Sequence, residues 1–255
     1  MGEMIGIRQQ SGTVKVYRAL PQGVGRFKGA VILNHELWGL TDQIKRVADR
    51  LAGQGYYVLA PDLFSTDRID RQPTEELQRQ IFSPDPKVRY RAMPTFRALM
   101  APTQTPQFTS LVVSRLLACF EYAYNQPLVH QKVVMVGFGL GGDYAYDLAV
   151  RERRLRGIVV FYAHAPRLVA ELRHIYCPVL ALYGSKETSL MKELDSLHDK
   201  MKQADREFKS VVYEGSNHAF FNDSNVFAYN QYASDDAWGR MISFINEHCG
   251  VIGND

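Results

Sequence analysis

The chain has 255 residues, of which 46% are hydrophobic, and its formal net charge is +3. This length fits one large α/β domain or two small ones, and the composition can supply a sizeable core. The small charge and the lack of a Lys/Arg cluster give no indication of a nucleic-acid partner. The N-terminus lacks a signal-peptide pattern and no apolar run approaches the roughly 20 residues that span a bilayer, so we expect a cytoplasmic protein without membrane contact.

Apolar runs alternate with helical patterns along the chain. Strands are predicted at 13–20, 29–34, 56–60, 133–136, 157–162, 178–183 and 209–213. Helices are predicted at 41–52, with Thr41 as a candidate cap, at 108–124, from 143 onward, and at 190–204 and 234–248. Buried β-branched strands that alternate with helices predict a doubly wound, mostly parallel sheet with helices on both faces.

The segment 65–107 differs from the rest of the chain, because its periodicity weakens and it contains many prolines. We interpret it as an insertion or cap within a single domain that spans 1–255. The cysteines are odd in number and lack the spacing of metal ligands. They are predicted to be reduced thiols, and the first two to be core residues: Cys119, Cys177 and Cys249.

The stretch 132–147, KVVMVGFGLGGDYAYD, reads as a buried strand, a sharp glycine-rich turn and the start of a helix. This arrangement is typical of the nucleophile elbow of α/β-hydrolases, Gly-x-nucleophile-x-Gly, in which a strained turn raises the nucleophile above the sheet. The flanking glycines are Gly137 and Gly141. The position between them, where Ser or Cys is expected, is Gly139.

Two further loops follow predicted strands and should lie at the same edge of the sheet. His218 follows the last strand, where the histidine base of this fold belongs, and Glu187 follows 178–183, where the orienting acid belongs. A surface histidine and a solvated loop glutamate are the alternative interpretations. Asp195 is a second candidate for the acid, although it falls within a predicted helix.

Several motifs in order resemble the dienelactone hydrolase family of the α/β-hydrolase superfamily: HELWGL, APDLF, GFGLGG, LYGSKE and SNHAFFNDSNVFAYNQYASDDAW. The resemblance covers residues 12–248 and is weakest at 65–107. It implies a single α/β-hydrolase domain, no metal and no organic cofactor. In that family a Cys-His-Asp triad opens small lactones and esters of carboxylate-bearing compounds.

The resemblance also implies roles for individual residues. His218 matches the family's base, and Glu36 matches a glutamate that contacts the resting thiol. The backbone N–H groups of Leu37 and Leu140 match the oxyanion hole, whose donors face the developing negative charge. Two residues match aromatic positions of the last loop and helix, namely Tyr229 and Trp238.

Three departures from the family pattern limit what the resemblance implies. Gly139 replaces the nucleophilic Cys, Glu187 replaces Asp, and Asn225 stands where the family often has a carboxylate-binding arginine. Arg68 or Arg71 could supply the other arginine, or both could be solvated charges.

Three functions remain open at this stage. The first is a hydrolase of small esters or lactones with weak, water-mediated activity. The second is a non-catalytic or inactivated member that binds a small acidic or lactone-like ligand. The third is an interaction role for 65–107. The oligomeric state and the natural substrate stay open.

Overall fold

The protein is described by a computed structural model that covers residues 2–9, 12–23, 27–64 and 74–249. Within these residues the centre of the fold is an eight-stranded sheet. Its strands are arranged in the order β1-β2-β4-β3-β5-β6-β7-β8. β1 and β2 are antiparallel to their neighbours, and the other strands are parallel. The strands are β1 Glu3–Gln9, β2 Gly12–Ala19, β3 Ala30–Asn34, β4 Tyr57–Pro61, β5 Val133–Phe138, β6 Gly157–Phe161, β7 Val179–Gly184 and β8 Phe208–Tyr213. This architecture confirms the predicted α/β-hydrolase fold with a mostly parallel sheet.

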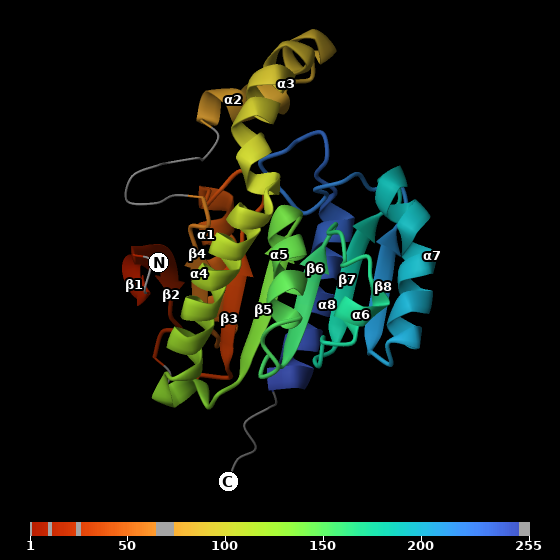
Figure 1. The fold of residues 1–255 in the computed structure, drawn as a ribbon. Helices are drawn as coiled ribbons and strands as arrows, with labels where there is room; N and C mark the ends of the chain where they lie inside the picture. The colour runs from red at the N-terminus through yellow and green to blue at the C-terminus, as the bar shows by residue number, and fades with distance from the viewer. Residues whose placement is uncertain (1, 10–11, 24–26, 65–73, 250–255) are drawn as a thin grey trace.

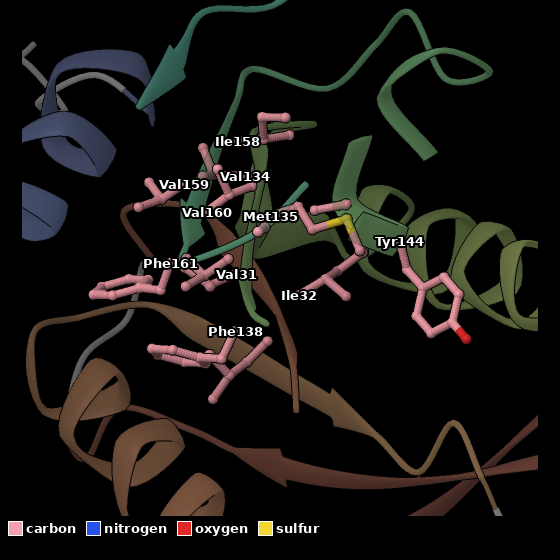
Figure 2. Close-up of a cluster of buried hydrophobic side chains, with 14 of the residues drawn as sticks. Val31, Ile32, Val134, Met135, Phe138, Tyr144, Ile158, Val159, Val160 and Phe161 are labelled. Atoms are coloured by element: carbon pink, nitrogen blue, oxygen red, sulfur yellow. The ribbon is translucent and has the colours of Figure 1, made fainter. Parts of the chain in front are cut away.

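The central strands β3, β4, β5, β6 and β7 are buried at every residue. Their side chains form one hydrophobic cluster, in which Met135 on β5 has Ile32 on β3 and Ile158 on β6 as its register partners (Figure 2). Strands covered on both faces need apolar residues at successive positions rather than at alternate ones. The runs of Val, Ile and Leu in the sequence therefore predicted these strands well.

Helices cover both faces of the sheet (Figure 1). α4 and α5 lie on one face, and α1 and α8 lie on the other. The helices are α1 Asp42–Gly53, α2 Glu75–Ile81, α3 Pro86–Met100, α4 Pro106–Tyr124, α5 Leu140–Ala149, α6 Val169–Leu172, α7 Thr188–Gln203 and α8 Gln231–Cys249; short 3₁₀ helices lie at Ala101–Gln104 and Pro127–Val129. No helix of these residues is long and apolar enough to cross a membrane.

The strand order reverses around β3, which lies between β4 and β5. The chain leaves β3 toward β4 and later returns on the other side as β5, with Asn34 opposite Gly137 in the register. Parallel α/β sheets bind ligands at such a reversal, outside the carboxyl ends of the strands. The loops after β3 and β5 meet there, and the loops after β7 and β8 end at the same edge.

Several predicted boundaries shift. α5 begins at Leu140 rather than at 143, α7 at Thr188 rather than at 190, and α8 at Gln231 rather than at 234. Thr41 is the N-cap residue of α1, but its side chain makes no capping hydrogen bond. The edge strand β1 was not predicted, because its exposed residues lack the apolar run that marks a central strand.

The described part of the segment 65–107 forms α2, α3, the 3₁₀ helix Ala101–Gln104 and the start of α4. Of these, α2 and α3 project beyond the carboxyl edge of the sheet (Figure 1). Trp38, in the loop after β3, joins this segment to the body of the protein. Its ring lies 4.7 Å from that of Phe82 and 5.2 Å from that of Phe96. Since Trp38 is buried, these aromatic contacts fix the base of the projecting segment.

Candidate active site

Gly139 forms the sharp turn between β5 and α5. Its backbone has φ 51° and ψ −122°, a conformation that residues with a Cβ adopt only under strain. The turn is fixed by the Gly139 N–H, which donates to the Phe161 carbonyl at 2.9 Å. Gly141 lets α5 approach the end of β3, since a Cβ there would lie 2.3 Å from the His35 carbonyl oxygen. The glycines therefore position the start of α5 at the strand reversal.

The side-chain position of Gly139 lies beside a histidine and a tyrosine. A Cβ built there would lie 3.8 Å from Cε2 of Tyr162 and 3.9 Å from Nε2 of His218, both ordinary contact distances. Nothing in the surroundings thus excludes a small side chain or a small molecule from this position.

His218 and Glu187 are brought together from two loops. Nδ1 of His218 lies 3.1 Å from Oε2 of Glu187, and the Ser189 hydroxyl donates to Oε1 of Glu187 at 2.5 Å. The hydrogen bond from His218, with that from Ser189, lowers the pKa of Glu187 to about 2. Glu187 is thus a carboxylate at neutral pH. When Nδ1 holds the proton that it donates to Glu187, Nε2 is left as an acceptor facing position 139.

Local structure explains this pairing. Glu187 is the N-cap residue of α7 and follows β7 by three positions, while His218 lies in the loop after the neighbouring strand β8. The two loops are tied together by backbone hydrogen bonds from Ser185 to Tyr213 at 3.1 Å and from Lys186 to Ser216 at 3.0 Å. Because β7 and β8 pair in parallel, Glu187 and His218 follow them at the same edge of the sheet and lie next to each other.

Glu36 is buried beside this pair, with 6% of its surface exposed. The Tyr162 hydroxyl donates to its Oε1 at 2.5 Å, and the Asn222 amide donates to its Oε2 at 2.8 Å. Burial raises the pKa of Glu36, and the two hydrogen bonds oppose that rise. Its carboxyl group is therefore fully engaged by neutral donors from two other loops.

Tyr162 connects Glu36 with His218. Its ring lies 4.9 Å from the His218 ring, and its backbone has φ 42°, an uncommon conformation for a residue with a side chain. Ala219, directly after His218, also has a positive φ of 60°. Uncommon backbone conformations of this kind cluster at functional sites.

Asp143, in the first turn of α5, is a further acid at this edge. Its Oδ1 accepts a hydrogen bond from the His164 N–H at 2.7 Å. Burial raises the pKa of Asp143 to about 7, although the His164 hydrogen bond opposes that rise. Sequence reasoning missed this residue, because its position in a helix gives no indication that the loop after β6 covers it.

The two predicted oxyanion donors lie on the elements that the prediction requires. Leu140 is the first residue of α5, so its N–H has no acceptor within the helix. Leu37 follows Glu36 in the loop after β3. In the described part of the chain, neither N–H donates to another backbone group.

Among the other predicted site residues, Asn225 and Tyr229 make no hydrogen bond to Gly139, Glu187 or His218 within the described ranges. Arg68 and Arg71 fall outside the described residues. Asn225 shapes a turn by accepting backbone hydrogen bonds from Ala228 and Tyr229 at 3.0 and 2.8 Å. Tyr229 lines a cavity between α1 and the segment 221–235, which includes the first turn of α8.

The ring of Trp238 lies under the Arg50 guanidinium, 3.9 Å from the ring centroid. Asp195, the second candidate for the acid, is exposed on α7, whereas Glu187 is paired with His218. The three cysteines are buried, and burial raises the pKa of each to about 12: Cys119, Cys177 and Cys249. Within the described ranges, no cluster of His, Cys, Asp and Glu could hold a metal ion.

Comparison with known proteins shows similarity along most of the chain. Residues 14–249 match the profile of the family described as "Dienelactone hydrolase family". A protein of Saccharolobus solfataricus named "Putative carboxymethylenebutenolidase" is 30% identical over 246 residues, which cover 91% of this chain and 93% of that protein.

Solved structures show the same fold. A crystal structure titled "Putative Dienelactone Hydrolase" from Klebsiella pneumoniae has a TM-score of 0.78 at 23% identity and covers 97% of this chain and 98% of its own. A dienelactone hydrolase-like promiscuous phosphotriesterase from metagenomic libraries has a TM-score of 0.74 at 18% identity, with the same coverage. The profile match spans most of the chain, and the protein therefore belongs to the dienelactone hydrolase family, with the α/β-hydrolase fold.

Proposed function

We propose that the protein hydrolyses small esters or lactones with water as the direct nucleophile. Gly139 occupies the position of the family's nucleophile and closes the acyl-enzyme route, because covalent catalysis needs a side chain there. A water molecule takes its place next to Nε2 of His218. His218 removes a proton as the water oxygen attacks the carbonyl, and Glu187 stabilises the imidazolium that forms.

The tetrahedral intermediate then collapses. Its oxyanion is stabilised by the N–H groups of Leu37 and Leu140, and His218 returns the proton to the leaving alkoxide. The products are a carboxylic acid and an alcohol, or a hydroxy acid when a lactone opens. A substrate carboxylate would be held near Arg68, Arg71, Asn225 or Tyr229, and the segment 65–107 would cap the site within one domain.

One observation supports this proposal above the others: Nε2 of His218 faces the open side-chain position of Gly139, while Nδ1 is held by Glu187. The pair is thus arranged to act on whatever occupies that space. Mutated triads retain about 10³–10⁴-fold catalysis over water from the oxyanion hole and binding alone, so we expect slow turnover.

Hydrolysis of a short-chain aryl ester by three proteins tests the proposal. We expect slow turnover by the protein itself, a loss of about 100-fold or more in His218→Ala, and faster turnover in Gly139→Cys. If the protein and His218→Ala hydrolyse the ester equally, the water mechanism is wrong. If all three are inert, small esters are the wrong substrate class.

The second candidate function is ligand binding without turnover, and the absence of a side chain at Gly139 favours it. A small carboxylate or lactone-like ligand should then raise the melting temperature by mass action without yielding product. Turnover that is lost in His218→Ala would exclude this alternative.

A further inference from the structure

His35 directly follows β3 and precedes Glu36 and Leu37, and the proposed mechanism does not use it. Only 1% of its surface is exposed. Its ring packs edge-on against the ring of Phe64, with the two centroids 4.7 Å apart. A histidine enclosed in this way is not placed to contact a substrate. Its role therefore lies in the groups that its two ring nitrogens contact.

Both ring nitrogens of His35 are hydrogen-bonded to backbone groups. Nε2 lies 3.1 Å from the Leu63 nitrogen, and Nδ1 lies 2.6 Å from the Glu36 carbonyl oxygen. The Leu63 N–H can only donate and the Glu36 carbonyl can only accept, so Nε2 must be bare and Nδ1 must carry the proton. Burial lowers the pKa of His35 below its ordinary value of 6.5, although the hydrogen bond to Glu36 and the charge of Asp62 oppose this. The ring is therefore neutral at pH 7 and is held in a single tautomer.

The carbonyl that accepts from His35 belongs to the same peptide group as one of the two proposed oxyanion donors. The Glu36 C=O and the Leu37 N–H are the two ends of one planar, trans peptide, and they point in opposite directions. A hydrogen bond that fixes the carbonyl therefore also fixes the direction of the Leu37 N–H. The Gly39 N–H donates to the same carbonyl at 3.2 Å, which closes the turn 36–39. Hydrogen bonds accepted by a carbonyl polarise the peptide, so they also strengthen its N–H as a donor.

The partner of Nε2 is itself held in place from α4. Arg115 on α4 donates from Nη1 to the Leu63 carbonyl at 2.6 Å, and only 5% of its surface is exposed. Both backbone groups of Leu63 are thus engaged by buried side chains, the N–H by His35 and the carbonyl by Arg115. A continuous set of hydrogen bonds therefore runs from α4 through the loop after β4 to the loop after β3.

We propose that His35 is a positioning residue that aims the Leu37 N–H at the oxyanion of the tetrahedral intermediate. This inference rests on the proposed hydrolysis, because Leu37 acts as an oxyanion donor only there. His35 exchanges no proton with the substrate or with water. Its neutral ring holds the peptide between Glu36 and Leu37 in the orientation that the intermediate requires, so the donor needs no reorganisation during the reaction.

Two amide variants separate this role from a role in packing alone. The side-chain amide of asparagine can place an N–H where His35 has Nδ1, whereas that of glutamine reaches the position of Nε2. His35→Asn should therefore keep the hydrogen bond to Glu36 and lose the one to Leu63, and His35→Gln should do the reverse. Both variants should lower the melting temperature, since each loses one buried hydrogen bond and the ring contact with Phe64.

Hydrolysis of the aryl ester gives the first readout. Loss of one oxyanion donor costs about 10²–10³-fold in kcat, so misdirection of one should cost His35→Gln about tenfold or more in kcat with KM unchanged. His35→Asn should retain most of the parent's kcat. The same order should hold in the Gly139→Cys protein, because either nucleophile generates the same oxyanion. The control is Ile158→Val, which removes a buried methyl group at the start of β6 and should lower the melting temperature without changing kcat.

The second readout does not depend on turnover. Nitrogen-15 NMR of the unaltered protein at pH 7 should show His35 with a protonated Nδ1 and a bare Nε2. A protonated Nε2, or equal losses of kcat in His35→Asn and His35→Gln, would overturn the positioning role even if the ester is hydrolysed. If the protein and His218→Ala hydrolyse the ester equally while the order of the two amide variants persists in Gly139→Cys, the water mechanism fails and the positioning role of His35 stands.

Discussion

Gly139 occupies a backbone conformation that glycine adopts more easily than any other residue. Its φ of 51° is strained for a residue with a Cβ, whereas the space around that Cβ is open to 3.8 Å. Any cost of a substitution here therefore comes from the backbone and not from a steric clash.

We predict that Gly139→Cys and Gly139→Ala both lower the free energy of unfolding by about 1–2 kcal/mol, since strain of this kind costs about 1–3 kcal/mol and the lower unfolded-state entropy offsets a part. Urea unfolding measures the change. Gly53→Ala is the control, because Gly53 lies in α1 with open space around it and should be stabilised by the same replacement. Equal or higher stability of both position-139 variants would contradict a strained turn.

Glu187 should make stability depend on acid pH. The pKa of Glu187 is about 2 in the folded protein, whereas its ordinary value is 4.5. Its contribution to the stability of the folded state is therefore complete above pH 4.5 and is lost as the pH falls toward 2. The stability difference between the protein and Glu187→Gln should therefore shrink over this range in urea unfolding. Asp195→Asn, an exposed change on the same helix, should show no such trend. A difference that stays constant from pH 4.5 to 2 would exclude a His218–Glu187 pair.

Asp143 should change the stability of the folded protein with pH in the opposite direction. Burial raises its folded pKa from 3.8 to about 7, so the folded state binds a proton more tightly than the unfolded state does. The contribution of Asp143 to the stability of the folded state is therefore complete below about pH 4 and is lost as the pH rises toward 7. Relative to Asp143→Asn, the protein should lose stability across that interval. If the two proteins follow parallel curves from pH 4 to 7, the folded protein does not raise the pKa of Asp143.

Trp38 anchors the projecting helices α2 and α3 to the body of the protein. Its ring contacts both Phe82 and Phe96, whereas Tyr90 on α3 is 81% exposed. We predict that Trp38→Ala lowers amide-exchange protection at 75–100 by about tenfold or more and leaves β5 protected. Tyr90→Ala should change neither. Uniform loss of protection in Trp38→Ala would show that Trp38 supports the whole domain instead.

Sequence patterns predicted elements with strong periodicity and missed those without it. The buried strands β3 to β7 were predicted from continuous apolar runs, but the exposed edge strand β1 was not. The start of α5 was predicted three residues too late. Four glycines surround this start, and glycine is typical of turns rather than of helices, so the sequence pattern does not mark where the helix begins.

The candidate site is assembled from contacts between residues that lie far apart in the sequence. Position and chain order suggested His218, Glu187 and Gly139. Tyr162 and Asn222, however, reach Glu36 across 126 and 186 residues of sequence. Such contacts depend on how the strands are ordered and how the loops after them bend, which no local pattern reveals.

The most direct test of the account is intact-protein mass measurement during turnover of an aryl ester. For hydrolysis by water at Gly139, the protein should release alcohol and acid without an initial burst and without any acylated species. Gly139→Cys should show both a burst and the mass of one acyl group, because it regains a nucleophile. An acylated form of the unaltered protein would contradict the central claim and would require a nucleophile elsewhere in the chain.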